Sequence, residues 1–324
     1  MSKLIRQLLP FVSLLLIIVG LSIHDLFFVH GHAQFLTEDN FLNVLRRSSV
    51  NAIIAVGMTA IIISGGIDLS VGSMMALAGM AGAWTMSKLG GDTLSISSMW
   101  LGTAAGVVVG IASGLLNGSL ITRLKLPPFI VTLGTMSVFR GISYVMNEGQ
   151  PYNVPGYKYL GSGELARIPA SILIALLIVV LASLVLRFTP LGRYTYAIGS
   201  NREAAFHAGI AVDRNLTVIY TLAGLLVGIA AMIATSRTVS AQPTAGIGLE
   251  LDIIAAVVIG GASLSGGRGT ILGTIIGTLL ISFLRNGCTL LGISTNVQLI
   301  VIGAIIVIAV AVDQMARSRT KSAG

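Results

Sequence analysis

The sequence predicts an all-α membrane protein, a polytopic helical bundle of about ten transmembrane helices. Only 10% of its 324 residues are charged and 54% are hydrophobic, whereas soluble domains carry about 25% charged residues. Apolar stretches of about 20 residues, the length that crosses a bilayer as a helix, recur from one end of the chain to the other. They are too long and too continuously apolar for the strands of a membrane barrel.

Ten apolar segments fit this pattern, and we expect them to form one transmembrane domain over residues 1–324. In chain order they are 8–29, 48–64, 69–87, 98–122, 128–147, 170–187, 215–235, 251–262, 270–286 and 296–312. Lys3 and Arg6 precede the first segment, which we expect to be a retained span rather than a cleaved signal peptide. The eighth is short and flanked by glycine, so it either spans the membrane or is re-entrant, where protein or a wet cavity would cover its backbone.

The distribution of positive charge predicts the orientation of these spans. With the N-terminus inside, the inner segments hold twelve of the twenty Lys and Arg residues, in the direction of the positive-inside rule. The long loop at 188–214 strengthens this bias, and both termini then lie in the cytoplasm. The net charge of +8 is spread along loops without a basic face, so the expected surroundings are membrane lipid and not nucleic acid.

Glycine recurs at every fourth position in two spans. One series lies in the fourth span and the other in the ninth: Gly102, Gly106, Gly110, Gly114 and Gly118, then Gly269, Gly273 and Gly277. Small residues let neighbouring backbones approach closely, and lipid supplies little hydrophobic drive between helices. We expect packing within the chain, although a homodimer seam would use the same surface.

Two inner segments have similar sequences, Gly-Gly-Ile-Asp-Leu-Ser-Val-Gly at 65–72 and Gly-Gly-Ala-Ser-Leu-Ser-Gly-Gly at 260–267. The topology gives both the same orientation near the inner face. Coincidence between two segments rich in small residues is one explanation. The other is a pair of non-helical turns whose backbone could line a path.

Polar groups inside the spans are few. Arg140 falls in the middle of the fifth span, where an unpaired cation costs about 2.5–3.5 kcal/mol on insertion scales. It should therefore face the bundle or a wet cavity, as an anchor on carbonyl groups or as a gating group, with Asp68 as a candidate partner. A weak, transient path for a substrate could be lined by a set of such groups: Asn51, Asp68, Ser70, Asn117, Thr132, Arg140 and Asn286.

Sequence patterns for catalysis are missing. The chain has no Gly-Lys dipeptide and therefore no Walker loop, no His-Glu-x-x-His motif and no serine nucleophile elbow. Cys288 is the only cysteine, which excludes an intrachain disulfide and a cysteine metal cluster. We therefore expect no catalytic residues, no metal site and no cofactor. Because mid-membrane titratable groups are scarce, a proton-coupled transporter is disfavoured.

The loop 188–214 contains the signature of a short helix. The segment from Ser200 to Gly209 predicts about two turns, with Ser200 as the N-cap, Glu203 completing a capping box and Gly209 ending the helix in a left-handed conformation. So short a helix is marginal in water by itself, which suggests that it is presented to a partner. On the outer side, the turn-rich loop 148–169 is either a plain surface loop or a dock for an outer partner.

Five separated runs resemble the monosaccharide branch of bacterial ABC importer permeases. They are 48–59, 65–73, 190–194, 241–246 and 250–261. The resemblance implies the membrane-spanning subunit of an ATP-driven importer in the bacterial inner membrane, which carries a monosaccharide, ribose or a related sugar, by alternating access. It also implies three partners: a cytoplasmic ATP-binding subunit that hydrolyses ATP, a periplasmic sugar-binding protein, and a second permease subunit, itself or a different chain.

The resemblance also implies a role for the polar loop. Arg202, Glu203, Ala204 and Ala205, with Gly209 four residues later, match the core of the loop by which such permeases engage their ATPase. The longer pattern of other permease branches is not present. Three alternatives stay open: a permease on the same scaffold for a nucleoside, an autoinducer or a branched-chain amino acid, an ion-coupled secondary transporter or channel, and an intramembrane enzyme.

Overall fold

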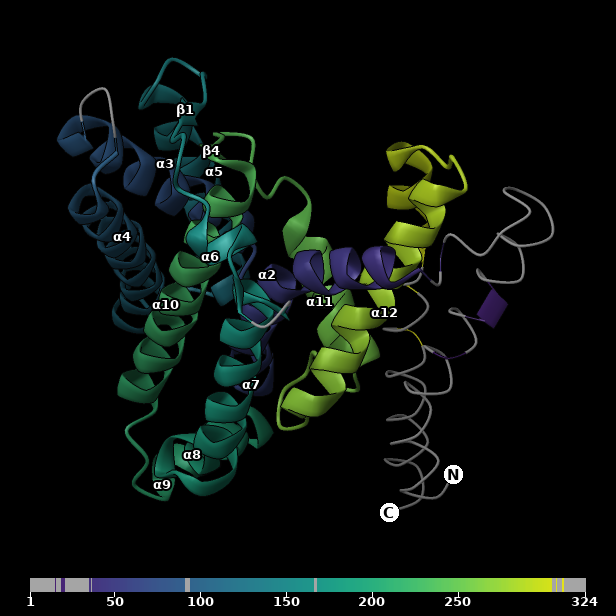
Figure 1. The fold of residues 1–324 in the computed structure, drawn as a ribbon. Coiled ribbons are helices and arrows are strands. Elements are labelled where there is room, and N and C mark those ends of the chain that lie inside the picture. Colours follow the sequence, from purple (N-terminus) through teal and green to yellow (C-terminus); the bar gives the residue numbers. More distant parts are fainter. Residues whose placement is uncertain are drawn as a thin grey trace.

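The computed structural model describes residues 37–90, 94–165 and 168–304, together with Leu15, Val19, Gly20, Phe35, Val307 and Ala311. Apart from four two-residue strands, the regular structure of these residues is helical (Figure 1). Six helices in the described ranges are long and apolar enough to cross a membrane: α2 (Glu38–Ile63), α4 (Ile96–Arg123), α5 (Pro128–Val145), α7 (Ala170–Phe188), α10 (Val212–Thr238) and α12 (Ile271–Leu290). The predicted all-α membrane fold is therefore confirmed.

The predicted count of ten spans stays a prediction. The first predicted span, 8–29, lies almost wholly outside the described residues, and the last, 296–312, is described as the apolar helix Thr295–Ala304 and at Val307 and Ala311. The second predicted span, 48–64, corresponds to the C-terminal part of the longer helix α2. α2 begins ten residues earlier, at Glu38, and Thr37 caps it by accepting a hydrogen bond from the Asn40 N–H. The search for apolar segments missed these polar first turns.

Two further helices are sheltered by the others. Most of α3 (Val71–Gly90) and of the short α11 (Leu249–Ile259) is buried. α3 packs against α4, α5 and α10, and α11 packs against α2 and α12. The main hydrophobic core lies where α2, α3, α10 and α11 meet, around side chains such as Ile53, Met74, Val227 and Ile253. Because protein surrounds these two helices, they can be shorter or less apolar than a helix that faces lipid.

The glycine series of α4 packs within the chain, as predicted. A Cβ atom on Gly110 would lie 2.7 Å from the Gly228 Cα of α10, and one on Gly118 would lie 2.9 Å from the Thr217 Cα. Closer to the N-terminus of α4, a Cβ on Gly106 would lie 2.8 Å from a backbone oxygen of α3. These separations leave no room for a side chain, so the backbones of α4, α10 and α3 are in direct contact.

Two of the three glycines in the second series do the same between α12 and α11, whereas Gly269 precedes α12, and a Cβ atom there would lie 2.9 Å from the Ile63 side chain. Gly273 lies against the Gly260 carbonyl and Gly277 against the Ala256 carbonyl, both closer than a Cβ atom would allow. The two series thus join neighbouring helices of one chain. α2 connects the two groups, since it packs against α10 on one side and against α11 and α12 on the other (Figure 1).

The two ends of the bundle differ. At one end lie the helices α8 (Pro190–Ser200) and α9 (Arg202–His207). At the other, β1 (Tyr152–Asn153) pairs with β4 (Ser240–Ala241), and α6 (Tyr159–Ser162) leads to the hairpin of β2 (Glu164–Leu165) and β3 (Ile168–Pro169) (Figure 1). We refer to them as the α9 end and the β1 end.

The loop at the β1 end is held against the bundle. The Val154 N–H donates to the Val239 carbonyl at 3.0 Å, and the buried Tyr157 hydroxyl is 2.7 Å from the Thr103 hydroxyl. Burial raises the pKa of Tyr157 to about 12, although the Thr103 hydrogen bond opposes the rise. This loop is therefore a fixed surface and not a free arm.

We expect Gly110→Ala to lower the free energy of unfolding by about 1–3 kcal/mol, because the added methyl group must push α4 away from α10. Thermal unfolding in detergent can be followed with a thiol-reactive fluorophore, since Cys288 is the sole cysteine and is buried. Gly134→Ala on α5 is the control, because a Cβ there meets nothing within 4 Å. A wild-type unfolding temperature for Gly110→Ala would contradict the packing described.

Candidate functional site

The short helix expected in the loop 188–214 is α9, and it begins one residue later than predicted. Ser200 is the last residue of α8, and the cap is Asn201, whose Oδ1 accepts a hydrogen bond from the Ala204 N–H at 2.9 Å. Asn201 has extended backbone angles, so α8 ends and α9 starts within a single residue. The predicted Ser200 cap is therefore wrong, and Glu203 stands too early in the helix to complete a capping box.

The predicted end of α9 is confirmed. Gly209 has a φ of +82°. Its N–H donates to the Phe206 carbonyl at 2.9 Å, and the Ile210 N–H donates to the Ala205 carbonyl at 3.1 Å. This pair of bonds is the Schellman arrangement, which satisfies the last carbonyls of a helix and favours glycine at the left-handed position.

One face of α9 is attached to the bundle and the other faces are exposed. Ala205 is buried against Ile198 of α8 and against Val212 and Leu216 of α10. Arg202, Glu203, Ala204 and His207 are exposed. So is Phe206, at 66%, which the sequence analysis did not single out. The signal was available, because Phe206 is a large apolar residue in the middle of a polar loop.

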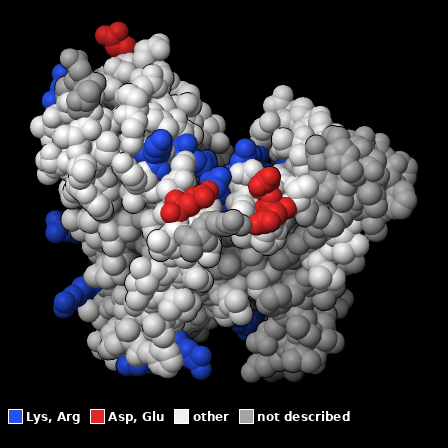
Figure 2. All heavy atoms as spheres, in the orientation of Figure 1, with Lys and Arg blue, Asp and Glu red and all other residues white. Residues whose placement is uncertain are grey.

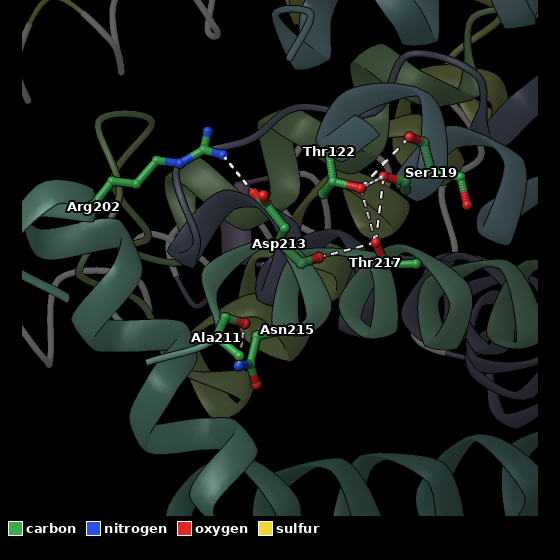
Figure 3. Close-up of polar contacts among 8 residues, drawn as sticks. Ser119, Thr122, Arg202, Ala211, Asp213, Asn215 and Thr217 are labelled. Atoms are coloured by element: carbon green, nitrogen blue, oxygen red, sulfur yellow. Dashed lines mark hydrogen bonds and ion pairs between the residues drawn. The ribbon is translucent and has the colours of Figure 1, made fainter. Parts of the chain in front are cut away.

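A polar chain of contacts joins α9 to α10 and α4 (Figure 3). The Arg202 guanidinium is 3.1 Å from the Asp213 carboxylate at the start of α10. The Thr217 hydroxyl donates to the Asp213 carbonyl at 2.9 Å and lies 3.1 Å from the Thr122 hydroxyl of α4. Both members of the ion pair are more than half exposed, so it contributes about 0–1 kcal/mol and holds α9 only weakly.

Four of the seven predicted path residues gather at the turn between α2 and α3. The Asp68 carboxylate accepts hydrogen bonds from the Ser70 N–H at 2.8 Å and the Ser70 hydroxyl at 2.6 Å. The Asn117 amide of α4 donates to the Ser70 hydroxyl at 2.8 Å, and the Thr132 hydroxyl of α5 donates to the Ile67 carbonyl at 3.3 Å. Burial raises the pKa of Asp68, and the Ser70 and Asn117 hydrogen bonds oppose the rise. The cluster is buried and fixes the turn against α4 and α5.

Arg140 lies apart from that cluster. Its guanidinium donates to the Pro243 carbonyl at 2.6 Å and to the Ala245 carbonyl at 2.7 Å. The suggested pairing with Asp68 is therefore wrong, because that carboxylate is already satisfied by Ser70 and Asn117. The structure gives Arg140 the carbonyl contacts that the sequence left as one of two alternatives. They tie α5 to the segment between β4 and α11.

The remaining two path residues, Asn51 and Asn286, line a large polar cavity toward the β1 end. Its volume is about 800 Å³, and α2, α10, α11 and α12 contribute to its wall. Asn286 exchanges side-chain hydrogen bonds of 3.0 and 2.9 Å with Asn40. Asn51 and Asn286 therefore share one cavity, while Asp68, Ser70, Asn117 and Thr132 form a separate buried cluster.

Four arginines surround this cavity: Arg46, Arg47, Arg237 and Arg285. Two of them are paired, since Arg46 is 3.3 Å from Glu164 and Arg285 is 2.7 Å from Asp252. Among the described residues, none makes an ion pair with Arg47 or Arg237. Figure 2 shows basic and acidic side chains gathered around the hollow in the middle of the molecule. The cavity therefore has an excess of positive charge.

A smaller hollow of about 250 Å³ lies at the α9 end. Its wall includes Gly65 and Gly66 from the turn after α2, Gly199 and Ser200 from the end of α8, and Tyr220 of α10. The two inner segments of similar sequence, 65–72 and 260–267, begin in non-helical turns here. Within the described ranges, no three His, Cys, Asp or Glu residues come together as metal ligands would.

The chain is similar in sequence to known transport permeases. A family model described as "Branched-chain amino acid transport system / permease component" matches residues 40–310. The chain is 44% identical to the ribose import permease protein of Bacillus subtilis, over 95% of this chain and 93% of that protein. It is 42% identical to the ribose import permease protein of Escherichia coli K12, over 86% and 87% of the two chains.

A further relative is the L-arabinose transport system permease protein of Escherichia coli K12. It is 36% identical, over 93% of this chain and 90% of its own length. No solved structure matches the chain. The similarity to these three permeases extends over most of each chain.

Proposed function

Since the chain belongs to the branched-chain amino acid transport system / permease component family, we propose that it is the membrane-spanning subunit of an ATP-driven importer for a monosaccharide, ribose or a related sugar. The assignment of the cargo rests on the identity of 42–44% to two ribose import permeases over at least 86% of this chain. The family description names branched-chain amino acids, but the names of the three relatives described above refer to sugars. The chain is a transport subunit and not an enzyme.

Energy then comes from a separate cytoplasmic subunit that binds and hydrolyses ATP. The α9 end lies in the cytoplasm together with both termini, and the β1 end lies in the periplasm. Closure of the ATP-binding subunits moves α9, and the spans alternate between outward and inward access. A second permease subunit, which we propose is another copy of this chain, completes the pore, and copurification of two differently tagged copies tests this.

Uptake of labelled ribose into proteoliposomes should require three components together: this chain, its ATP-binding subunit and a sugar-binding protein. Vanadate should abolish the uptake, and collapse of the proton gradient should leave it unchanged. Unlabelled ribose should compete, and leucine should not. Leucine competition would instead assign an amino-acid cargo, while uptake that survives ATP depletion would indicate a secondary transporter.

Phe206 is the residue of α9 that best suits a protein contact. It is an exposed aromatic ring on a helix that ends in a rigid Schellman turn, beside the exposed Glu203 and Arg202. Aromatic and arginine side chains dominate protein interfaces, where a central anchor contributes about 2 kcal/mol or more. We propose that Phe206 inserts into the ATP-binding subunit and that Arg202, Glu203 and Ala204 surround it.

Phe206→Ala should therefore weaken the affinity for the ATP-binding subunit about thirtyfold, which corresponds to about 2 kcal/mol. Binding to the detergent-solubilised chain can be measured by titration. Tyr159→Ala is the matched control, since this ring is also 66% exposed but lies at the β1 end. If both variants bind alike, Phe206 is not an anchor of that interface.

The positive cavity at the β1 end suits the approach of a partner with acidic side chains. No residue that the structure describes makes an ion pair with Arg47 or Arg237. Arg237 also lies near two other cations of the cavity, Arg46 and Arg47, which repel it. Opposite charges on a partner would relieve this repulsion and speed association. We propose that the sugar-binding protein docks here and releases its cargo toward Asn51 and Asn286.

The double variant Arg47→Gln/Arg237→Gln should slow association of the sugar-loaded binding protein on the order of tenfold and reduce its dependence on salt. Association can be followed by surface plasmon resonance on the chain in nanodiscs. Lys88→Gln is the control, because this cation at the end of α3 lies outside the cavity. Unchanged kinetics and salt dependence in the double variant would rule out this docking site.

A further inference from the structure

The end of α8 is clamped between two segments that are far apart in the sequence. The Gly267 N–H donates to the Ile63 carbonyl at 2.8 Å, so the turn after α11 is bonded to the last residue of α2. Gly199 lies directly over this hydrogen bond. A Cβ atom on Gly199 would be 2.7 Å from the Gly267 nitrogen and closer still to the Ile63 oxygen. Three backbone segments therefore meet without side chains between them.

A side-chain contact reinforces this junction. The Tyr196 hydroxyl, on the same helix one turn before Gly199, donates to the Gly269 carbonyl at 2.8 Å. Burial raises the pKa of Tyr196, so the hydroxyl stays protonated and remains a donor at neutral pH. α8 thus contacts the turn after α11 at two points, and any displacement of α8 must carry that turn with it.

The junction lies next to α9. Asn201 alone separates Ser200, the last residue of α8, from Arg202, the first residue of α9. Asn201 is extended and its side chain caps α9. By comparison, the link from α9 to α10 includes an exposed ion pair, Arg202 to Asp213, of little energetic weight. α9 is also joined to α10 through the buried Ala205, so a force on α9 reaches Gly199 along the chain as well as α10.

Two helices receive this force. Ile63 ends α2, and the 260–270 turn connects α11 with α12. Both α2 and α11 continue to the large cavity, where they contribute Asn51 and Asp252 to its wall. The 250 Å³ hollow beside Gly199 and Ser200 leaves room for the end of α8 to move. The two turns are also those that have similar sequences, at 65–72 and 260–267.

We propose that Tyr196 and Gly199 are positioning residues of the transport cycle, which couple α9 to the turns after α2 and after α11 at the same time. Movement of α9 then shifts both helices that reach the large cavity, and ATP hydrolysis at one end changes access at the other. This inference rests on the proposed function, because it needs a partner that moves α9.

Tyr196→Phe tests the proposal, since it removes the hydroxyl and keeps the ring. In proteoliposomes with the complete transporter, we expect the ratio of sugar transported to ATP hydrolysed to fall about two- to tenfold, the range for one hydrogen bond. The affinity for the ATP-binding subunit should not change, and the unfolding temperature should fall by at most a few degrees, the cost of this one hydrogen bond. Tyr194→Phe on the same helix is the control, because no hydrogen bond to its hydroxyl is found among the described residues.

Gly199→Ala should have a larger effect in the same direction, because the methyl group would displace the Ile63 and Gly267 backbones. A wild-type transport ratio in Tyr196→Phe would overturn the proposal. So would a fall in the ratio that is matched by weaker binding of the ATP-binding subunit or by an equal fall in Tyr194→Phe, since Tyr196 would then have no specific role in coupling. ATP-dependent uptake by the wild type in the same vesicles tests the proposed function separately.

Discussion

Direct contact between helix backbones is the constraint on which this structure depends. Within lipid there is little hydrophobic drive to bring one apolar helix against another, so cohesion must come from close approach and hydrogen bonds. The glycines of α4 meet α10 and α3 in this way, and those of α12 meet α11. A methyl group at most of these positions would separate the helices. The same device, used once more at Gly199, brings α8 against two turns at the α9 end.

This close packing decides where polar groups can be placed. The turn between α2 and α3 enters the interior because Ser70 and Asn117 donate hydrogen bonds to the Asp68 side chain, which lowers the cost of burying it. Arg140 is similarly satisfied by two backbone carbonyls of the segment before α11. The groups that remain accessible are collected at the two ends of the bundle. At one end α9 presents the exposed Phe206 ring, and at the other end lies a cavity with excess positive charge.

The two ends are connected by continuous helices. α2 has Ile63 in the junction at the α9 end and Asn51 in the wall of the large cavity, and α11 leads from Asp252 in that wall to the turn that contains Gly267. The proposed function needs such a connection, because it places ATP hydrolysis at the α9 end and the cargo at the β1 end. Rigid helices joined by glycine contacts can supply it, whereas a chain of exposed ion pairs such as Arg202 to Asp213 could not.

The sequence by itself determined the fold class, most of the described helices, the packing faces of α4 and α12, and the left-handed end of α9. These features depend on residues close together in the chain, and hydropathy, glycine spacing and cap residues are all local signals. It misplaced the start of α9 because Ser200 and Asn201 are both good caps, and the choice between them depends on where α8 ends. Only the tertiary structure decided that Asp68 and Arg140 are apart, that four arginines share a cavity, and that Gly199, Ile63 and Gly267 meet. Those contacts join residues from different helices, and their energies depend on packing that no local pattern records.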